Sequence, residues 1–428
     1  MNNPLLCYYG DDFTGSTDAL EALAANGVPG VLFLDAPDEH ELSRFPECQV
    51  IGIAGESRSR GPEWMSEHLP PIFRKLKAYG APLCLYKVCS TFDSSPDRGS
   101  IGRALEIGQD VFGNPYVPIA AAAPHLKRFV LFGNLFAAGP GGVYRIDRHP
   151  GMRQHPVTPM NEGDLRLHLA HQTRRKIALL DILAIHGNDP ERRLDDVLAD
   201  NPAAVLFDGL DERSLGVAGR LLCTRSNAAQ MFVVGSSGLT HALVHYWRQS
   251  GIIPRQYDPA RAAPADRLIV ISGSCSPSTE IQIRWAMQNG FAHLRIDLSM
   301  ESRQALITSA LSALSAGRSI VFYTALGLAD CGGNPHGEEL GSYLGSLLRE
   351  LLMRSGVRRA LIAGGDTSSH AMRELNVHAL TFAGITVPGA PLCRCHSSES
   401  WLDGVEVVLK GGQVGPENYF EIVQKGNQ

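Results

Sequence analysis

Short, continuous apolar segments recur along the chain and are separated by longer amphipathic stretches. Residues 50–54 (VIGIA), 268–271 (LIVI) and 360–363 (ALIA) show no alternation between polar and apolar positions. This pattern is typical of strands covered on both faces, as in parallel sheets. Similar segments are predicted as strands at residues 5–9, 31–34, 83–88, 117–122, 129–132, 177–180, 204–207, 231–234, 320–323 and 405–409.

Helical patterns lie between these segments, which predicts an α/β fold. The clearest helices are expected at residues 16–26, 276–289 and 338–355. The second begins with Ser276 as a plausible N-cap, followed by Pro277 at the first helical position.

A Pro- and Ala-rich stretch at residues 251–267 separates two such α/β blocks and marks a domain boundary. We therefore expect two α/β domains with mainly parallel sheets and a cleft between them, at residues 1–255 and 256–428. Residues 124–159 are rich in Gly, Pro, His and Arg, and we interpret them as an irregular excursion near a site.

Composition excludes several classes of protein. The net charge is −5, so no global field attracts nucleic acid or an anionic membrane. No apolar run of about 18 residues and no leader sequence is found, so no membrane span is expected. The nine cysteines include no CxxC pair, which fits a reducing cytoplasm and predicts no metal site; metal binding by Cys393, Cys395 and the following His396 is the alternative. The sequence leaves a homo-oligomer open.

Asp11 and Asp12 directly follow the first predicted strand and precede a Thr-Gly turn into a helix. Ligands of open α/β sheets bind beyond the carboxyl ends of the strands. An aspartate there can orient or deprotonate a substrate hydroxyl. The alternative is that one aspartate caps the helix while the other is solvated, and the sequence leaves both interpretations open.

Two further strands of the first block are followed by polar segments. Arg58 follows the strand at 50–54, and its guanidinium could bind a carboxylate with two hydrogen bonds. Lys87 lies near the end of the apolar strand at 83–88, where an unpaired lysine is rare, and a dense set of donors and acceptors follows it. The alternatives are a surface arginine and ordinary turn chemistry.

Glycine-rich turns follow three strands of the second block, at residues 272–276, 364–369 and 410–415. The first two lead into helices, whose N-termini favour anions such as phosphate. Lys410 could reach a phosphate, although a glycine-rich hairpin is the alternative. No Walker A motif is present, and no GxGxxG follows the first strand of either block, which argues against a dinucleotide-dependent dehydrogenase.

Taken together, these motifs resemble the four-carbon acid-sugar kinase family. The resemblance covers nearly the whole chain, and its motifs occur in the family's order. They are DDFTG (11–15), SRS (57–59), YKVCSTFDSS (86–95), HPVTPM (155–160), SGSCS (272–276), GGDTSS (364–369) and KGGQVG (410–415).

The resemblance implies an N-terminal acid-sugar domain and a C-terminal ATP domain. It implies that threonate, erythronate or a 3-oxo-tetronate is phosphorylated from ATP, with Mg²⁺ bridging the phosphates. Asp12 or Asp11 would lie at the sugar hydroxyl. The acid-sugar pocket would be lined by Arg58, Lys87, Ser90, Thr91 and Asp93. The ATP site would be formed by Ser274, Ser276, Gly364, Gly365, Asp366, Thr367, Gly411, Gly412 and Gln413.

Two segments depart from the family pattern. Residues 123–150 lack the Gly-Arg-Thr element that many members carry, so a branched acid such as an oxo-isoapionate becomes a candidate substrate. The final loop reads KGGQVG where a Lys-Ser-Gly-Asn form is common. The competing hypotheses are a non-catalytic sensor of nucleotide or sugar acid and a different α/β enzyme, such as a dehydrogenase or aldolase.

Overall fold

The computed structural model describes residues 4–155, 157–296, 303–330 and 337–426. The chain divides into two compact units. Unit 1 consists of Met1–Asp11, Asn26–Pro29 and Ala36–Tyr257. Unit 2 consists of Asp12–Ala25, Gly30–Asp35 and Asp258–Gln428. Both units are α/β, as the apolar segments predict.

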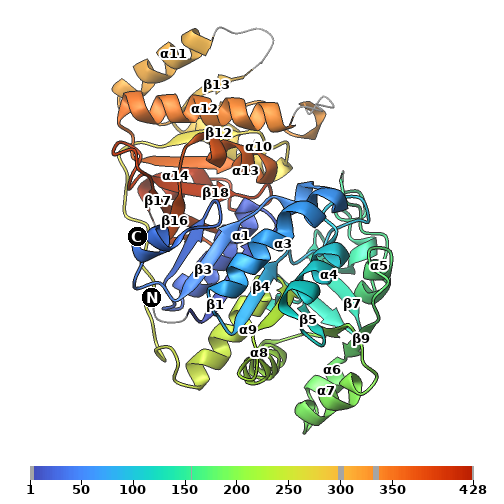
Figure 1. The fold of residues 1–428 in the computed structure, drawn as a ribbon. Coiled ribbons are helices and arrows are strands. Elements are labelled where there is room, and N and C mark those ends of the chain that lie inside the picture. The colour runs from blue at the N-terminus through green and yellow to red at the C-terminus, as the bar shows by residue number, and fades with distance from the viewer. Residues whose placement is uncertain (1–3, 156, 297–302, 331–336, 427–428) are drawn as a thin grey trace. The chain divides into compact units, whose positions relative to one another are not determined.

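Unit 1 is built on a sheet of seven parallel strands in the order β3-β1-β4-β11-β5-β10-β9. Figure 1 labels β1, β3, β4, β5 and β9 of this sheet. Their bounds are β1 Leu6–Gly10, β3 Val50–Ala54, β4 Leu83–Lys87, β5 Val117–Ala120, β9 Ile177–Leu180, β10 Ala204–Phe207 and β11 Met231–Gly235. The parallel arrangement confirms the interpretation of the continuous apolar segments.

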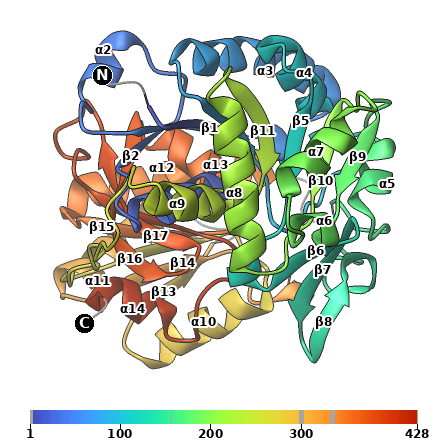
Figure 2. The same cartoon turned by 90° about the horizontal axis from the view of Figure 1, so that it is seen from below.

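Helices connect these parallel strands, and α8 and α9 lie side by side (Figure 2). The helices are α2 Glu39–Ser43, α3 Pro62–Ala78, α4 Ile101–Phe112, α5 Leu165–Ala170, α6 Ile182–Ile185, α7 Pro190–Leu198, α8 Glu212–Ser226 and α9 Ser237–Gln249. Short 3-10 helices are η1 Ser57–Ser59, η2 Pro124–Leu126 and η3 Ile146–Arg148.

The expectation of an irregular excursion at residues 124–159 is wrong for much of that segment. It contains a second, antiparallel sheet of β6 Arg128–Leu131, β7 Asn134–Gly139 and β8 Gly142–Arg145 (Figure 2). Gly133 lies in the turn between β6 and β7, and Gly141 lies in the turn between β7 and β8, both with positive φ. Glycine adopts such φ angles without steric cost, so the same residues serve tight hairpins.

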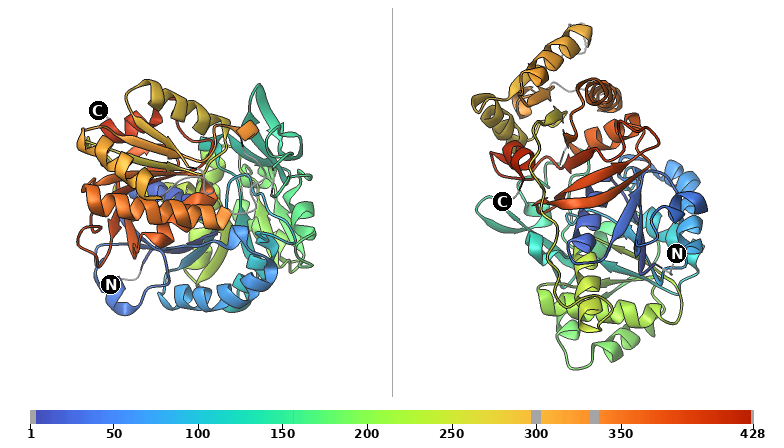
Figure 3. Two further views of the ribbon diagram at one scale, coloured as in Figure 1. Left: turned by 90° about the horizontal axis from the view of Figure 1, so that it is seen from above. Right: turned by 90° about the vertical axis from the view of Figure 1, so that its left-hand side faces the viewer.

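Unit 2 has a mixed sheet in the order β13-β14-β12-β15-β18-β17-β16-β2. β13, β14, β12, β15 and β18 are parallel to one another, whereas β17, β16 and β2 pair antiparallel. The strands are β2 Gly30–Phe33, β12 Ile269–Ser272, β13 Ala292–Arg295, β14 Ile320–Tyr323, β15 Arg359–Ala363, β16 Ala379–Val387, β17 Ala390–His396 and β18 Glu406–Lys410. The β16–β17 hairpin (Figure 3) is not among the predicted strands.

The helices of unit 2 are α1 Phe13–Ala24, α10 Pro277–Gln288, α11 Arg303–Ser315, α12 Gly337–Ser355, α13 Gly365–Glu374 and α14 Tyr419–Lys425, with the 3-10 helix η4 Leu328–Asp330. The second and third helix predictions are confirmed to within two residues at each end. Among the described residues, no helix combines the length and the apolar character that a bilayer span requires.

Helix α1 comes from the N-terminal part of the sequence but packs within unit 2. It contacts β2, β16, β17 and β18, and also α13. Its carboxylate Glu21 accepts a hydrogen bond of 2.8 Å from the backbone N–H of Gly389, in the turn of the β16–β17 hairpin. The helix begins at Phe13, three residues before the predicted start, because Asp12 is its N-cap.

Candidate functional site

Three adjacent strands of unit 2 end side by side. In the parallel ladders, Ser272 of β12 pairs with Ala363 of β15, and Ala363 pairs with Lys410 of β18. The three glycine-rich turns predicted from the sequence therefore follow neighbouring strands at the carboxyl edge of one sheet. This edge is where open α/β sheets bind their ligands.

The turn between β15 and α13 leaves the start of that helix without a side-chain cap. Gly364 is the N-cap residue, with φ 122° and ψ 132°, and among the described residues no side chain caps the N–H groups of the first turn. The first backbone N–H groups of a helix have no intrahelical acceptor. Those of Gly365, Asp366 and Thr367 therefore offer donors to an anion, while the Asp366 side chain is exposed.

The glycines of this edge are required by close packing between the turns. A Cβ on Gly273 would lie 2.3 Å from Thr367 Oγ1, and one on Gly364 would lie 2.9 Å from the same atom. A Cβ on Gly412 would meet Ser276 Cβ at 3.1 Å and Ser274 Oγ at 3.3 Å. The three turns thus contact one another directly, as a site for one ligand requires.

Helix α10 differs from α13 because its start is already capped. Ser276 Oγ accepts a 3.2 Å hydrogen bond from Thr279 N, and Pro277 has no N–H to offer. Ser274 Oγ accepts from Ser276 N at 3.3 Å. The exposed Gln413 accepts from Ser278 at 3.0 Å. The sequence predicts anion sites at the starts of both α10 and α13. In the structure, the start of α13 offers more backbone N–H groups to a ligand than the start of α10.

Lys410 is the last residue of β18, at the start of the third turn, and is fully buried. Its Nζ donates to Thr279 Oγ1 at 2.8 Å, to Gly411 O at 3.0 Å and to Gly412 O at 3.2 Å. Burial lowers the pKa of Lys410 to about 7, because the ammonium is removed from water. The sequence does not single out Thr279, whose role appears only when α10 meets this turn.

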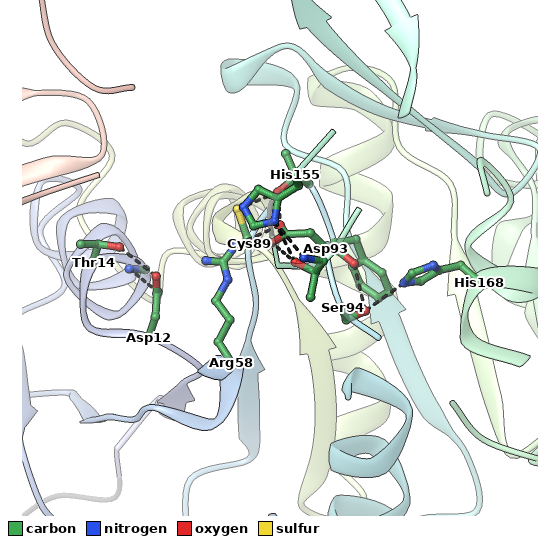
Figure 4. Close-up of polar contacts among 12 residues, drawn as sticks. Asp12, Thr14, Arg58, Cys89, Asp93, Ser94, His155 and His168 are labelled. Carbon is green, nitrogen blue, oxygen red and sulfur yellow. Dashed lines mark hydrogen bonds and ion pairs between the residues drawn. The ribbon is translucent and has the colours of Figure 1, made fainter. Parts of the chain in front are cut away.

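Asp12 lies beside the open start of α13. Its Oδ1 accepts from Gly15 N at 2.7 Å, and its Oδ2 accepts from Thr14 Oγ1 at 2.9 Å (Figure 4). The same Oδ2 is 3.9 Å from the position that a Cβ on Gly365 would occupy. The capping interpretation is thus confirmed for Asp12, and capping leaves its carboxylate beside the candidate anion site. The expectation that the other aspartate is solvated is wrong, because Asp11 is buried.

The predicted acid-sugar residues of unit 1 lie along the carboxyl edge of its sheet. Gly10 pairs with Lys87, and Lys87 pairs with Gly235. Asp11 N donates to Lys87 O at 2.9 Å, and Arg58 N donates to Asp11 O at 3.1 Å. The structure therefore brings Asp11, Arg58 and Lys87 to one edge through their backbones.

Asp93 is buried and joins several of these segments (Figure 4). Arg58 Nη2 donates to both of its carboxylate oxygens, at 2.9 and 2.8 Å. Thr91 Oγ1 donates to Oδ1 at 2.5 Å, and Thr158 Oγ1 donates to Oδ2 at 3.2 Å. His155 Nδ1 in turn accepts from Thr158 N at 3.1 Å. One carboxylate thus holds Arg58 and Thr158 in place, and Thr158 in turn contacts His155.

Burial raises the pKa of Asp93, but the charge of Arg58 and the hydrogen bonds from Thr91 and Arg58 outweigh it. The result is a pKa of about 2, below the ordinary value of 3.8. A carboxyl group whose pKa is lowered by folding stabilises the protein above its unfolded pKa. That contribution is lost as the pH falls from about 4 through about 2.

We therefore expect Asp93→Asn to lower the free energy of unfolding by about 2 kcal/mol at pH 7. The difference from the unchanged protein should shrink as the pH falls below about 4. Urea unfolding curves at pH 7, 5, 4 and 3 measure it. Asp97→Asn, in an exposed part of the same loop, is the matched control and should change little. A difference in the free energy of unfolding that stays constant with pH would contradict a stabilising role for the charge of Asp93.

A second polar network in unit 1 is centred on Ser94, the residue after Asp93, and includes His168 and Gln172, which were not predicted. His168 Nε2 is 2.9 Å from Ser94 Oγ, and Gln172 Nε2 donates to the same hydroxyl at 2.9 Å. Burial lowers the pKa of His168 to about 4, so its ring is neutral near pH 7. Gln172 Oε1 also accepts from Gly102 N at 3.1 Å, which ties the segment after α5 to the start of α4. Ser90 is half-buried in the neighbouring loop.

Within the described residues, no group of three or more His, Cys, Asp or Glu side chains is placed to hold a metal ion. Cys393 and Cys395 are both buried on β17. Burial raises the pKa of both thiols, which keeps them protonated.

Comparison with known proteins identifies the two halves. The family model described as a sugar-binding N-terminal domain matches residues 6–243, and the one described as a nucleotide-binding C-terminal domain matches residues 269–420. The 3-oxo-isoapionate kinase of Paraburkholderia graminis is 45% identical, with 99% of this chain and 94% of that protein covered. The chain belongs to the four-carbon acid-sugar kinase family.

Other relatives and solved structures are less similar to this chain. The 3-oxo-tetronate kinase of Cupriavidus necator is 28% identical, over 98% of this chain and 96% of that protein. A crystal structure from Salmonella typhimurium LT2, described as a tRNA synthase, superposes with a TM-score of 0.80 at 26% identity, covering 98% of both chains. Haemophilus influenzae HI1011 shares the fold, with a TM-score of 0.72 at 23% identity and 98% and 99% coverage.

Proposed function

We propose that this protein is an ATP-dependent kinase that phosphorylates a hydroxyl group of a small sugar acid. The observation that carries the proposal is the position of Asp12, a carboxylate beside the uncapped start of α13 and its glycine-rich turn. A hydroxyl acceptor for phosphoryl transfer needs both features, a group that takes its proton and donors that neutralise phosphate charge.

We assign the nucleotide to unit 2. The first N–H groups of α13 and the glycines at residues 364–365 and 411–412 would hold its phosphates, because backbone can approach closely where no Cβ intervenes. ATP supplies the phosphoryl group, and an accompanying Mg²⁺ offsets the charge of the phosphates. The described residues build no carboxylate cage for the ion, so it would be held mainly by phosphate oxygens and water.

We assign the acid sugar to the carboxyl edge of unit 1. Arg58 and Lys87 would bind the carboxylate, while Asp93 fixes the direction of the Arg58 guanidinium through two hydrogen bonds. Thr91 and Ser90 would contact hydroxyl groups. Asp12 would take the proton of the reacting hydroxyl at Oδ2, and Thr14 and Gly15 keep this carboxylate oriented.

Among sugar acids, we propose a branched 3-oxo acid of the isoapionate type as the preferred substrate. The relative named for that activity is 45% identical, whereas those named for 3-oxo-tetronate are 28% identical or less. The β6–β8 sheet adds a structural reason. It lies in the segment that departs from the family pattern, on the proposed substrate side.

The direct test is a panel of sugar acids assayed for ADP release with Mg·ATP. The panel contains 3-oxo-isoapionate, 3-oxo-tetronate, erythronate and threonate. We expect turnover of at least one 3-oxo acid, with a higher kcat/KM for the branched acid than for the linear one. No turnover with any member, despite ADP binding measured by calorimetry, would instead support a non-catalytic sensor. A preference for the linear acid would contradict the substrate assignment alone.

A further inference from the structure

We propose that Lys410 is a positioning residue, which turns the backbone N–H groups of Gly412 and Gln413 toward the nucleotide without itself contacting a phosphate. This inference concerns the nucleotide site of the proposed kinase and rests on that function. It assigns a role to the third glycine-rich turn that differs from direct contact between the lysine and a phosphate.

The side chain of Lys410 has no N–H donor left for a ligand. An ammonium group has three N–H donors. Those of Lys410 are matched by the hydroxyl of Thr279 and the carbonyls of Gly411 and Gly412, all within 3.2 Å. The side chain is fully buried among these acceptors. A phosphate could reach Nζ only by displacing one of them.

The two peptide groups Gly411–Gly412 and Gly412–Gln413 are oriented by their hydrogen bonds to Lys410. In a planar trans peptide, the N–H points opposite to the C=O of the preceding residue. The carbonyls of Gly411 and Gly412 both point to Lys410 Nζ, so the N–H groups of Gly412 and Gln413 both point away from it. Successive N–H groups that point to one side form a concave anion-binding surface.

Among the described residues, these two N–H groups, those of Gly412 and Gln413, have no hydrogen-bond acceptor. The Gly412 carbonyl, by contrast, is contacted by three side chains, those of Lys410, Thr279 and Ser276. The acceptor side of the turn is saturated, and its donor side is left for a ligand.

Thr279 makes the inference testable, because it holds Lys410 from the first turn of α10 and is itself fully buried. If Lys410 acts through the turn, loss of the Thr279 hydroxyl should weaken nucleotide binding in the same way as loss of the ammonium. If Lys410 instead contacts phosphate directly, Thr279 should matter little. The two substitutions together separate the roles.

The experiment measures ADP binding to the full chain by calorimetry in the presence of Mg²⁺, and KM for ATP separately from KM for the sugar acid. Lys410→Met and Thr279→Val should each weaken ADP binding, by about 10-fold to 100-fold for the lysine. The double variant should bind no more weakly than Lys410→Met, because both belong to one network. Thr279→Ser retains the hydroxyl and should restore binding. KM for the sugar acid should not change.

Several results would overturn the proposal. They are a Thr279→Val variant that binds ADP normally, effects that add in the double variant, or Thr279→Ser no better than Thr279→Val. Thermal unfolding identifies any variant that fails to fold. If Lys410→Met fails to fold, the comparison of ADP binding between Thr279→Val and Thr279→Ser tests the proposal without it. Because ADP binding is measured without a sugar acid, the result does not depend on whether the acid-sugar assignment succeeds.

Discussion

Replacing Asp12 by asparagine is expected to lower kcat by about 100-fold to 10,000-fold, the usual contribution of a general base. Asparagine keeps an oxygen that can accept the hydrogen bond from Gly15 N, and it is as good an N-cap as aspartate. Helix α1 should therefore remain intact. What is lost is the capacity to take a proton from a hydroxyl group, so KM for ATP should change little.

Steady-state kinetics with the best acid of the panel measure this effect. Asp189→Asn is the matched control, because Asp189 caps α7 in the same way, accepting from Arg192 N at 3.0 Å. It should leave kcat unchanged. Melting temperatures of both variants should stay within a few degrees of the unchanged protein. An Asp12→Asn enzyme with full kcat would exclude Asp12 as the base and direct attention to Asp11.

The second large effect is expected from Gly364→Ala. Gly364 has φ 122° and ψ 132°, a conformation that is essentially restricted to glycine, and its added Cβ would lie 2.9 Å from Thr367 Oγ1. The turn would have to move away from the start of α13. We expect KM for ATP to rise by about 100-fold, the scale seen when a positioning element shifts by about an ångström.

Backbone strain alone costs about 1–3 kcal/mol, so stability must be separated from binding. Gly317→Ala provides the matched control. Gly317 also has positive φ, at 78°, but nothing lies within 4 Å of an added Cβ. It should lower stability somewhat and leave KM for ATP unchanged. If Gly364→Ala binds ADP normally by calorimetry, the assignment of this turn to the nucleotide would be wrong.

Local sequence patterns predict most of unit 1's parallel sheet and the clearest helices. Continuous apolar runs identify buried strands because both faces are covered, and Ser276-Pro277 marks a helix start because capping is a local interaction. The β16–β17 hairpin was missed because its residues mix buried and half-buried positions, which match neither a continuous nor an alternating pattern.

Contacts within the candidate sites are less visible in the sequence. The motifs predict that Arg58, Thr91 and Asp93 are functional, and the structure joins them in one hydrogen-bonded cluster. The Thr158 contact with Asp93 spans 65 positions in the sequence. The motif at residues 155–160 contains Thr158, but no local pattern indicates that its hydroxyl contacts Asp93, so this contact is visible only in the folded chain.

The sequence by itself determined where strands end in glycine-rich or acidic turns, because strand, turn and cap depend on neighbouring residues. Only the tertiary structure decided which turns meet. It placed α1, and with it Asp12, in unit 2 beside Gly365, and it gave Lys410 a partner 131 positions away in Thr279. The reason is physical. An apolar helix face must be buried and a buried ammonium must find hydrogen-bond acceptors, but neither requirement specifies which distant segment meets it.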